Sequence, residues 1–319
     1  MKLSVALCTY NGERYFPEQL ASIQEQTRLP DELVICDDAS TDRTAAIARK
    51  FRERAPFEVR FELNSRNLGT TLNFDKAIGL CSGEAIVLAD QDDTWLPDKL
   101  SMLETTLQNC PESGFAFSDA EVVDEGLKPL GYTLWEALQF GAGERERFRR
   151  GKAFESLIQR YRVTGATVAF RAAYRDLILP IPRDWLHDAW IALMISAVAP
   201  CALISRPLIC YRQHDLQQFG GAKSNLYKQF LAARTRHRET FAALAHGYSS
   251  AFERLQKCPH VSQGRLALLD QKAAHCRQRM IMRNGGRLRL PLVFWELWQG
   301  NYHRFSRGWK TVAQDLLLT

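Results

Sequence analysis

Short apolar runs alternate with helical segments through residues 3–117, and this alternation restricts the fold more than any other feature of the sequence. The apolar runs predict buried strands at 3–8, 33–36, 59–63, 85–89 and 114–117. The segments between them predict helices at 17–26, 41–54, 70–80 and 97–109. Because such alternation is typical of a mainly parallel sheet with helices on both faces, we expect an α/β fold.

Acidic residues follow two of the predicted strands. Asp37 and Asp38 come directly after the second strand, and residues 90–93, Asp-Gln-Asp-Asp, come after the fourth. In open α/β sheets, ligands bind beyond the carboxyl ends of the strands. The acids therefore lie where a binding site is expected.

The segment 90–93 is the strongest chemical signal in the chain. Three carboxylates in four residues repel one another, and a divalent cation offsets such repulsion well. Oxygen ligands of this kind suit Mg²⁺ or Mn²⁺ held together with substrate phosphates. The alternative is a solvated acidic loop, or an N-cap for the helix that begins beyond Trp95.

The segment 37–42, Asp-Asp-Ala-Ser-Thr-Asp, indicates a second role. A carboxylate here can accept a hydrogen bond from the N3–H of a pyrimidine base more strongly than a neutral acceptor can. The alternative is N-capping of the next helix by Ser40, Thr41 or Asp42. Both can hold if Asp38 binds the base and a later residue caps the helix.

Beyond residue 118 the pattern is less regular. Residues 120–160 are polar and predict mostly loops. The other elements expected before residue 221 are a strand at 163–170, a buried helix at 189–199, and strand pieces at 203–204 and 208–211.

Charge divides the chain into two parts. Residues 223–319 carry 17 Lys and Arg against 5 Asp and Glu, a net charge of +12, whereas residues 1–222 carry 25 against 31, a net charge of −6. We expect a catalytic domain at 1–222, with halves at 1–118 and 119–222, and a basic, aromatic-rich helical extension at 223–319. The charge of the extension points to an anionic partner, either a membrane surface or a nucleic acid.

The eight cysteines are scattered and form no CxxC pair, which predicts reduced core thiols in a cytosolic protein. We see no secretory signal at the N-terminus. No apolar run reaches the ~18–20 residues that a membrane-spanning helix needs. We therefore expect a cytoplasmic location.

Four segments resemble the successive motifs of the family 2 glycosyltransferases, which have the GT-A fold. They are residues 5–12 (Val-Ala-Leu-Cys-Thr-Tyr-Asn-Gly), 37–42, 67–69 (Asn-Leu-Gly) and 90–93. One such motif would be weak evidence, but four in this order and spacing are strong. The resemblance implies a Rossmann-like, mainly parallel GT-A sheet flanked by helices, and an inverting, metal-dependent sugar transfer.

The second half of the chain continues the resemblance. Residues 163–167 (Val-Thr-Gly-Ala-Thr) resemble the family's glycine loop near the donor sugar, and His187-Asp188 resembles its catalytic acidic motif. Residues 211–214 (Tyr-Arg-Gln-His) resemble a subgroup whose late histidine helps to hold the metal. That subgroup contains bacterial O-antigen and capsule enzymes, often rhamnosyltransferases. Here Asp-Leu-Gln follows the histidine, whereas the subgroup tends to place Gly and Asn there.

The resemblance assigns roles to single residues. Asp38 would bind the base, with Asp37 as the second candidate, and Asp90 would contact the ribose or a metal-bound water. Asp92 and His214 would ligate Mn²⁺ or Mg²⁺. The other residues of the nucleotide-sugar pocket would be Thr9, Tyr10, Asn11, Asn67, Gly69, Gln91 and Gly165. Contacts to the donor sugar or the acceptor would come from Asp93, Trp95 and His187.

Asp188 would be the general base. Inverting transfer needs a carboxylate opposite the departing diphosphate, which takes the proton of the acceptor hydroxyl as its oxygen attacks the anomeric carbon. The transition state is oxocarbenium-like, as in glycoside hydrolysis, and a cation on the diphosphate stabilises it. The alternative is that Asp188 only caps a helix that begins at Ala189, and that His187 is structural.

The resemblance also suggests the partners. The donor would be a dTDP- or UDP-linked sugar such as L-rhamnose, and the acceptor a growing surface glycan or a lipid-linked oligosaccharide. In the extension, apolar residues 290–298 and later aromatic residues are interleaved with basic ones, among them Arg283, Arg287 and Arg289. This pattern suits an interfacial helix on an anionic leaflet, which predicts a peripheral protein on the inner face of the cytoplasmic membrane. The alternative is that Trp295 and Trp298 pack on the catalytic domain.

Three other functions fit parts of the sequence. A nucleic-acid-binding protein would explain the basic extension, but the acids at the strand ends would repel phosphates, so we expect no nucleic-acid partner. A sugar nucleotidyltransferase of related fold would carry a glycine-rich, basic loop at 9–14, which here is Thr-Tyr-Asn-Gly-Glu-Arg. An inactive sugar-binding homologue would not need both Asp92 and Asp188. Dinucleotide-binding and P-loop enzymes are disfavoured because GxGxxG and GxxxxGK[ST] do not occur.

Overall fold

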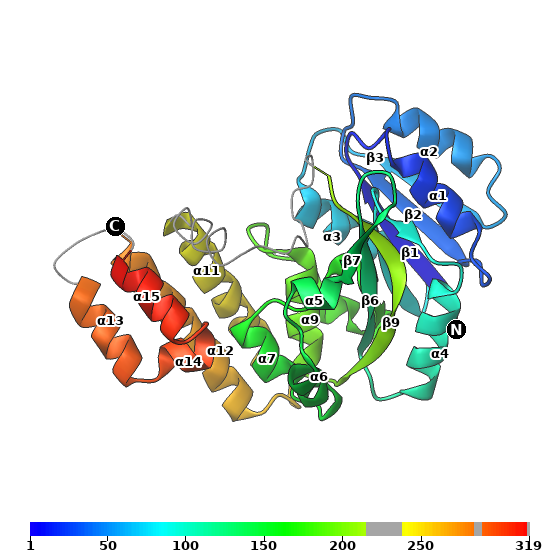
Figure 1. Cartoon of the computed structure of the whole chain (residues 1–319). Coiled ribbons are helices and arrows are strands. Elements are labelled where there is room, and N and C mark those ends of the chain that lie inside the picture. The colour runs from blue at the N-terminus through cyan, green and yellow to red at the C-terminus, as the bar shows by residue number, and fades with distance from the viewer. Residues whose placement is uncertain (215–237, 284–288, 318–319) are drawn as a thin grey trace. The chain divides into compact units, whose positions relative to one another are not determined.

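The computed structural model describes residues 1–214, 238–283 and 289–317 (Figure 1). The chain divides into two compact units, the first made of Met1–Ala153 with Arg162–Ala222 and the second of Phe154–Tyr161 with Lys223–Thr319. The segment 154–161, which we expected in the catalytic domain, thus belongs to the second unit. The functional division of the chain at residue 222 stays a prediction.

The first half of unit one follows the predicted alternation. Its four strands, β1 (Leu3–Thr9), β2 (Glu32–Asp37), β3 (Glu58–Leu63) and β4 (Ala85–Asp90), pair in parallel in the order β3-β2-β1-β4. The helices between and after them are α1 (Phe16–Gln24), α2 (Thr44–Arg52), α3 (Thr70–Leu80) and α4 (Lys99–Asn109). Because all four strands run in one direction, their carboxyl ends meet at one edge.

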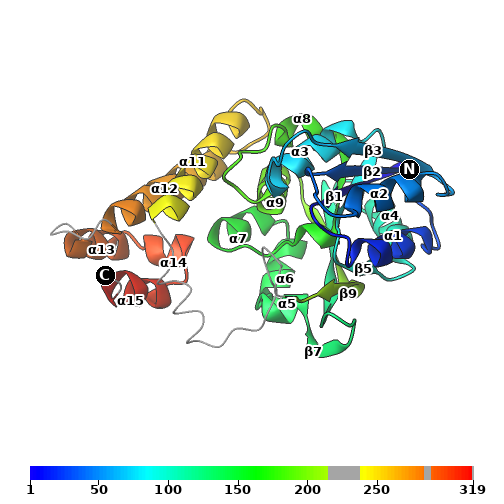
Figure 2. The same ribbon diagram turned by 90° about the horizontal axis from the view of Figure 1, so that it is seen from above.

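Helices cover both faces of this parallel sheet. Leu3, Val5 and Leu7 alternate along β1 and join a core that includes residues of α1, α2 and α4. Helix α3 packs on the other side, where it contacts β1 and β2, and Figure 2 shows it across the sheet from α1 and α2. Burial on both faces explains why β1 reads as a continuous apolar run rather than an alternating one.

The second half of the sheet is mixed, because it contains antiparallel pairs. Strand β8 (Val168–Arg171) lies antiparallel between β4 and β6 (Phe115–Val123), and β9 (Cys201–Arg212) pairs in parallel with β6. The short β5 (Thr94–Trp95) is antiparallel to β9, and β7 (Pro129–Thr133) is antiparallel to β6. The α/β fold class is confirmed, with the mainly parallel part limited to β1–β4.

Three local expectations differ from the structure. Residues 120–160 are not mostly loop: β6 extends to Val123, and β7 is followed by α5 (Leu134–Ala137), α6 (Ala142–Arg149) and α7 (Ala153–Gln159). The strand expected at 163–170 begins only at Val168, after a 3₁₀ turn at Gly165–Thr167. The two strand pieces near 203–211 are one twelve-residue strand, β9.

A buried helix completes unit one. Helix α9 (His187–Ser196) begins two residues earlier than expected, and nine of its ten residues are buried. It follows the single-turn helix α8 (Arg175–Ile178) and contacts both α8 and α3. Its first turn therefore lies on the α3 side of the sheet.

Unit two is helical throughout its described part. Its helices after α7 are α11 (Arg238–Leu255), α12 (Gln263–Met282), α13 (Arg289–Trp298), α14 (Asn301–Phe305) and α15 (Trp309–Leu317). Met282, Val293, Tyr302 and Val312 form one of its apolar clusters. None of the helices in the described part of the chain is long and apolar enough to cross a membrane.

Asp315 joins three elements of unit two. Its carboxylate accepts two hydrogen bonds from Arg279, at 2.8 and 2.9 Å, and one from the Tyr302 hydroxyl at 3.0 Å. Arg289 donates to its main-chain carbonyl at 2.7 Å. Because Asp315 and Arg279 are both buried, removal of one partner leaves an uncompensated charge in the interior.

We predict that Asp315→Ala lowers the free energy of unfolding of unit two by about 3–5 kcal/mol, the usual loss when a buried ion pair is broken. Urea unfolding followed by circular dichroism measures this. The matched control is Asp270→Ala on α12, because the Asp270 side chain is largely exposed and its ion pair with Arg277 is long, at 3.9 Å. Equal stability of the two variants would show that the buried pair contributes nothing.

Candidate active site at the carboxyl edge of the sheet

The acidic segment after β4 lies against the end of β9. Strand β5 pairs with β9 so that Thr94 is opposite Cys210, and this pairing joins segments more than 110 residues apart. As a result, the Asp92 carboxylate and His214 Nε2 are 2.8 Å apart. The two predicted metal ligands are thus brought together, and both side chains are mostly buried.

This pair suits a shared cation. Two ligands that bind one ion with bonds of about 2.1 Å lie about 3 Å apart, which is close to the observed separation. No group of three or more His, Cys, Asp or Glu side chains gathers around a possible ion within the described residues. Mg²⁺ and similar cations commonly take the remaining ligands from substrate phosphates and water, so two protein ligands fit this chemistry.

Arg212 fixes the position of both candidate ligands, and the sequence did not point to it. Its buried side chain donates from Nε to the Asp92 carbonyl at 2.8 Å and also binds the Glu125 carbonyl and the Glu18 carboxylate. The guanidinium lies 4.5 Å from the centre of the Tyr15 ring, and that ring in turn contacts the ring of His214 at 4.9 Å. The one feature of the sequence that could have pointed to Arg212 is its position two residues before His214.

Two titratable side chains at the acidic segment, those of Asp93 and Lys99, are fully buried. One Asp93 oxygen accepts from the Arg212 amide at 3.0 Å, and the other has no hydrogen-bond partner in the described structure. Burial, and then the charges of Asp92 and Asp90, raises the pKa of Asp93 well above its usual range. Lys99, also missed by the sequence, donates to the Ala166 carbonyl at 2.6 Å and lies 3.7 Å from the centre of the Trp95 ring. Asp93 and Trp95 therefore face the interior of the protein.

Asp90 ends β4 and is the first acid of the segment 90–93. Burial, followed by the charges of Asp92 and Asp188 and opposed by Lys99, raises the pKa of Asp90 to about 7. The glycine turn connects this segment with α9, because Gly165 donates to Asp188 and the carbonyl of the next residue, Ala166, accepts from Lys99.

Asp188 is held by two backbone amides. One of its carboxylate oxygens accepts from the Gly165 N–H at 2.9 Å, and the other accepts from the Ala189 N–H at 2.7 Å. Because α9 begins at His187, Asp188 lies inside the first turn and is not the N-cap, which is Leu186. Its carboxylate therefore does more than cap a helix: it joins α9 to the glycine turn.

His187 is packed against the same turn. Its ring stacks on Phe74 with centroids 3.9 Å apart, and burial lowers its pKa. Its Nε2 atom is buried without a hydrogen-bond partner in the described structure. A Cβ atom on Gly165 would lie 2.8 Å from this nitrogen and 3.3 Å from the Asp188 Cβ, so only glycine fits here without displacement.

The ends of β1, β2 and β4 are joined by side-chain hydrogen bonds. The Thr9 hydroxyl donates to Asp37 at 3.0 Å, and the Asn11 side chain accepts from the Thr41 N–H at 2.8 Å. The Gln91 side chain pairs with both backbone groups of Tyr10, at 2.9 and 3.1 Å. These predicted nucleotide-pocket residues are therefore neighbours, and the Tyr10 side chain is 43% exposed at their edge.

Asp38 binds the loop before α3. It accepts from the Leu68 N–H at 2.7 Å, the Gly69 N–H at 2.8 Å and the Asn64 side chain at 2.9 Å. Asn67 donates to the Asp38 carbonyl at 3.4 Å, and Gly69 has a φ of 86°, which favours glycine. In this structure the Asp38 carboxylate thus orders the Asn67–Gly69 loop. The Asp37 carboxylate is similarly engaged, by Thr9 and by the Ser40 N–H at 2.8 Å.

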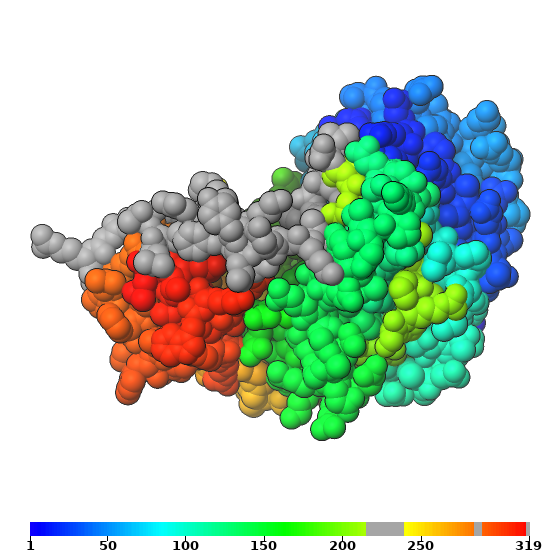
Figure 3. All heavy atoms as spheres, viewed as in Figure 1, coloured from blue at the N-terminus to red at the C-terminus, as the bar shows by residue number. Residues whose placement is uncertain are grey.

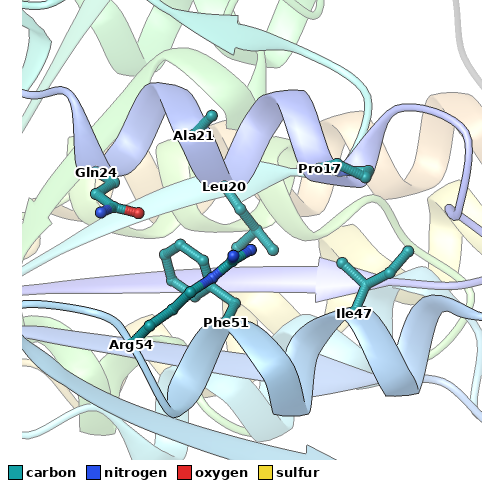
Figure 4. Close-up of a pocket in the computed structure, with 7 residues that line it drawn as sticks. All are labelled: Pro17, Leu20, Ala21, Gln24, Ile47, Phe51 and Arg54. Carbon is teal, nitrogen blue, oxygen red and sulfur yellow. The ribbon is translucent and has the colours of Figure 1, made fainter.

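A separate cavity lies between α1 and α2 (Figure 4). It is lined by Pro17, Leu20, Ala21, Gln24, Ile47, Phe51 and Arg54. This lining contains no carboxylate or histidine, so it offers none of the acid–base or metal-binding chemistry found at the carboxyl edge of the sheet.

Comparison with solved structures supports the GT-A fold. Residues 1–349 of Staphylococcus aureus TarS give a TM-score of 0.60 at 15% identity, covering 92% of this chain and 77% of that one. A mannosyltransferase from Pyrobaculum calidifontis, solved with GDP-Man and Mn²⁺, gives a TM-score of 0.54 at 18% identity, covering 99% of this chain and 85% of that one. At such identities the likeness concerns the fold.

Relatives by sequence extend over different lengths of the chain. An uncharacterised protein of Mycobacterium tuberculosis is 27% identical over 88% of this chain and 82% of its own length. The abequosyltransferase RfbV of Salmonella typhimurium is 35% identical over 111 residues, which are 34% of this chain and 33% of that protein. Residues 4–177, more than half of the chain, match the model of glycosyl transferase family 2. The chain therefore belongs to glycosyl transferase family 2.

Proposed function

We propose that this glycosyltransferase is inverting: it moves a sugar from a nucleoside diphosphate to a hydroxyl of a surface glycan or a lipid-linked oligosaccharide. The observation that carries the proposal is that Asp188 binds the glycine turn, which packs on β4 where Asp90 ends it, although at least 96 residues separate Asp188 from Asp90 and Asp92 in the sequence. A diphosphate with its cation and an acceptor hydroxyl need carboxylates on two sides of one site. The TarS structure with UDP-GlcNAc and the mannosyltransferase structure with GDP-Man support a nucleotide-sugar donor.

Asp92 and His214 would hold the cation, Mn²⁺ or Mg²⁺, which the Mn²⁺ of the mannosyltransferase structure supports. A bound cation supplies charge stabilisation for the departing diphosphate. The contribution of the protein is orientation: Arg212 binds the main chain of Asp92, and the Tyr15 ring lies against His214. The positions of both ligands are therefore set before any donor binds.

Asp188 would act as the general base. The acceptor oxygen forms a bond to the anomeric carbon, the bond from that carbon to the diphosphate oxygen breaks, and the hydroxyl proton passes to the Asp188 carboxylate. The two amide hydrogen bonds hold this carboxylate in one orientation, and attack opposite the leaving group inverts the configuration. His187 beside Gly165 would contact the sugar or the acceptor through Nε2, the nitrogen that has no hydrogen-bond partner among the described residues.

The joined ends of β1, β2 and β4 would bind the nucleotide. Exposed Tyr10 would stack on or flank the base, and Asp38 and Asp37 would contact it from β2, with Asn11, Asn67, Gly69 and Gln91 around them. We propose a dTDP- or UDP-linked donor, with L-rhamnose as one candidate sugar.

The site of action would be the cytoplasmic face of the inner membrane, where a lipid-linked acceptor is presented and where the basic extension would bind. A nucleic-acid partner is not proposed, because Arg279 and Arg289 of the extension bind Asp315 rather than facing outward.

We predict that Asp188→Asn lowers turnover by about 10²–10⁴-fold, the usual contribution of a general base. Donor binding, measured as thermal stabilisation by nucleotide sugars with Mn²⁺, should stay unchanged because Asp188 is not assigned to the donor or its cation; the asparagine keeps the size of the carboxylate and loses one of its two backbone hydrogen bonds. Asp184→Asn, an exposed change four residues earlier, is the matched control. Near-normal transfer rates in Asp188→Asn would remove Asp188 from the role of base.

We predict that Gly165→Ala lowers turnover nearly as far, because the added methyl group meets His187 and Asp188 and displaces the base. The control is Gly143→Ala, where an added Cβ meets nothing within 4 Å. Transfer rates of the two variants, compared at saturating donor, decide the point. A Gly165→Ala enzyme as active as the Gly143→Ala enzyme would show that the glycine turn does not position the base.

We predict that Asp92→Ala weakens Mn²⁺-dependent donor binding by at least about tenfold, the scale of losses seen when a metal site is disturbed. Titration of donor with and without Mn²⁺, followed by calorimetry, measures the loss. Glu112→Ala, an exposed acid between α4 and β6, is the control. If Asp92→Ala bound donor as tightly as Glu112→Ala in Mn²⁺, the proposed ligand would be wrong.

A further inference from the structure

Helix α13 has an outward face made almost wholly of large apolar side chains. Leu290, Phe294, Trp295 and Trp298 are 53, 61, 51 and 77% exposed. Leu290, Phe294 and Trp298 are four residues apart and Trp295 is three residues before Trp298, which places them along one side of the helix, and the two tryptophan rings lie 5.3 Å apart. We call these four residues the α13 face. Soluble proteins seldom expose large apolar side chains in such a group without a partner.

The acids near this face are all turned inward. Residues 289–317 contain two acidic residues, Glu296 and Asp315, and both are buried. Glu296 binds His275 of α12 and accepts from the Asn301 side chain at 3.0 Å, while Asp315 binds Arg279. The segment that carries the α13 face therefore presents no negative side chain to its surroundings.

The contacts around Glu296 have the order of a hydrolase triad, but not its surroundings. Ser306, His275 and Glu296 follow one another by hydrogen bonds, with 2.9 Å between Ser306 Oγ and His275 Nε2. The N–H groups of Ser306 and Gly308 donate to the Tyr302 carbonyl, and that of Arg307 donates to Thr311. The backbone around Ser306 thus offers no oxyanion donor. The contacts instead attach α13 and α14 to α12.

The exposed charges of this segment are cationic. Arg304, Arg307 and Lys310 are exposed shortly after α13 in the chain, and His303 lies against the exposed Trp309 ring, 5.5 Å between centroids. We expected Arg283 and Arg289 to contribute to a membrane-binding surface, but both bind Asp315. Arg283 lies 3.4 Å from the Asp315 carboxylate, and Arg289 donates to its main-chain carbonyl. Arg287 lies outside the described residues.

We propose that the α13 face binds the surface of an anionic phospholipid bilayer. The exposed Trp and Phe of α13, the exposed Arg and Lys at 304–310 in the segment whose helices α14 and α15 contact α13, and the lack of an exposed acid at 289–317 match the headgroup region of such a bilayer, where aromatic rings and cations both gain contacts. Helix α13 has ten residues, about 15 Å, against a hydrocarbon core of about 30 Å, so it would lie in the plane of the membrane. This inference rests on the proposed function only in that a lipid-linked acceptor gives membrane binding its purpose.

Vesicle sedimentation of the full chain tests the proposal. The wild-type protein should sediment with vesicles of phosphatidylcholine and phosphatidylglycerol, and much less with pure phosphatidylcholine. The double variant Phe294→Glu/Trp298→Glu should lose at least about tenfold in affinity, because two charges would enter the interface. The control Leu63→Glu/Leu130→Glu changes two exposed leucines of unit one and should bind as the wild type does.

The variant Phe294→Ser/Trp298→Ser removes both aromatic rings without adding charge, so it tests the proposal even if the glutamate variant does not fold. It should also bind anionic vesicles more weakly than the wild type. Equal recovery of wild type and folded variants on anionic vesicles would overturn the proposal. So would a dimer in solution that the variants dissociate, since the face would then be a contact between copies. Donor-dependent thermal stabilisation, measured on the same samples, reports separately on the glycosyltransferase site and should not change.

Discussion

Close approach of like charges is the constraint on which the active site depends. Burial and the neighbouring carboxylates of Asp92 and Asp188 raise the pKa of Asp90 to about 7. Such a group of acids stays folded only where donors and cations are supplied nearby. Arg212 binds the main chain of Asp92, and Lys99 opposes the rise in the pKa of Asp90. The Asp92 carboxylate contacts His214 Nε2, and the Asp188 carboxylate accepts from two backbone amides.

The part of this arrangement that lies along one strand edge was predictable, because it follows from local information. The apolar runs that become β1, β2 and β4 are long enough to be buried on both faces, and parallel strands bring their carboxyl ends together. Thr9, Asp37 and Gln91 had to be neighbours once those strands paired. That neighbourhood needs no knowledge of the rest of the chain.

The remainder depended on pairings that no local pattern reveals. The exposed residues of β7 lack the apolar alternation of a half-buried strand, so residues 120–160 resembled loops. Arg212 looks like an ordinary polar residue at a strand end, and its burial becomes apparent only when Glu18, Asp92 and Glu125 come together around it. A fully buried Lys99 is equally invisible in sequence, because lysine is rarely found inside a protein unless it is paired.

The net charge of the extension predicted its surface less well than the contacts that each charged side chain makes. The sequence gives residues 223–319 an excess of twelve positive charges, yet Arg279, Arg283 and Arg289 are committed to Asp315 within the fold. These contacts remove three arginines from the surface together with one acid, Asp315. The exposed charges of residues 289–317 are therefore few, but all of them are cationic. Together with the exposed tryptophans, they favour a partner that is anionic and has an apolar interior more strictly than a larger charge of mixed sign would.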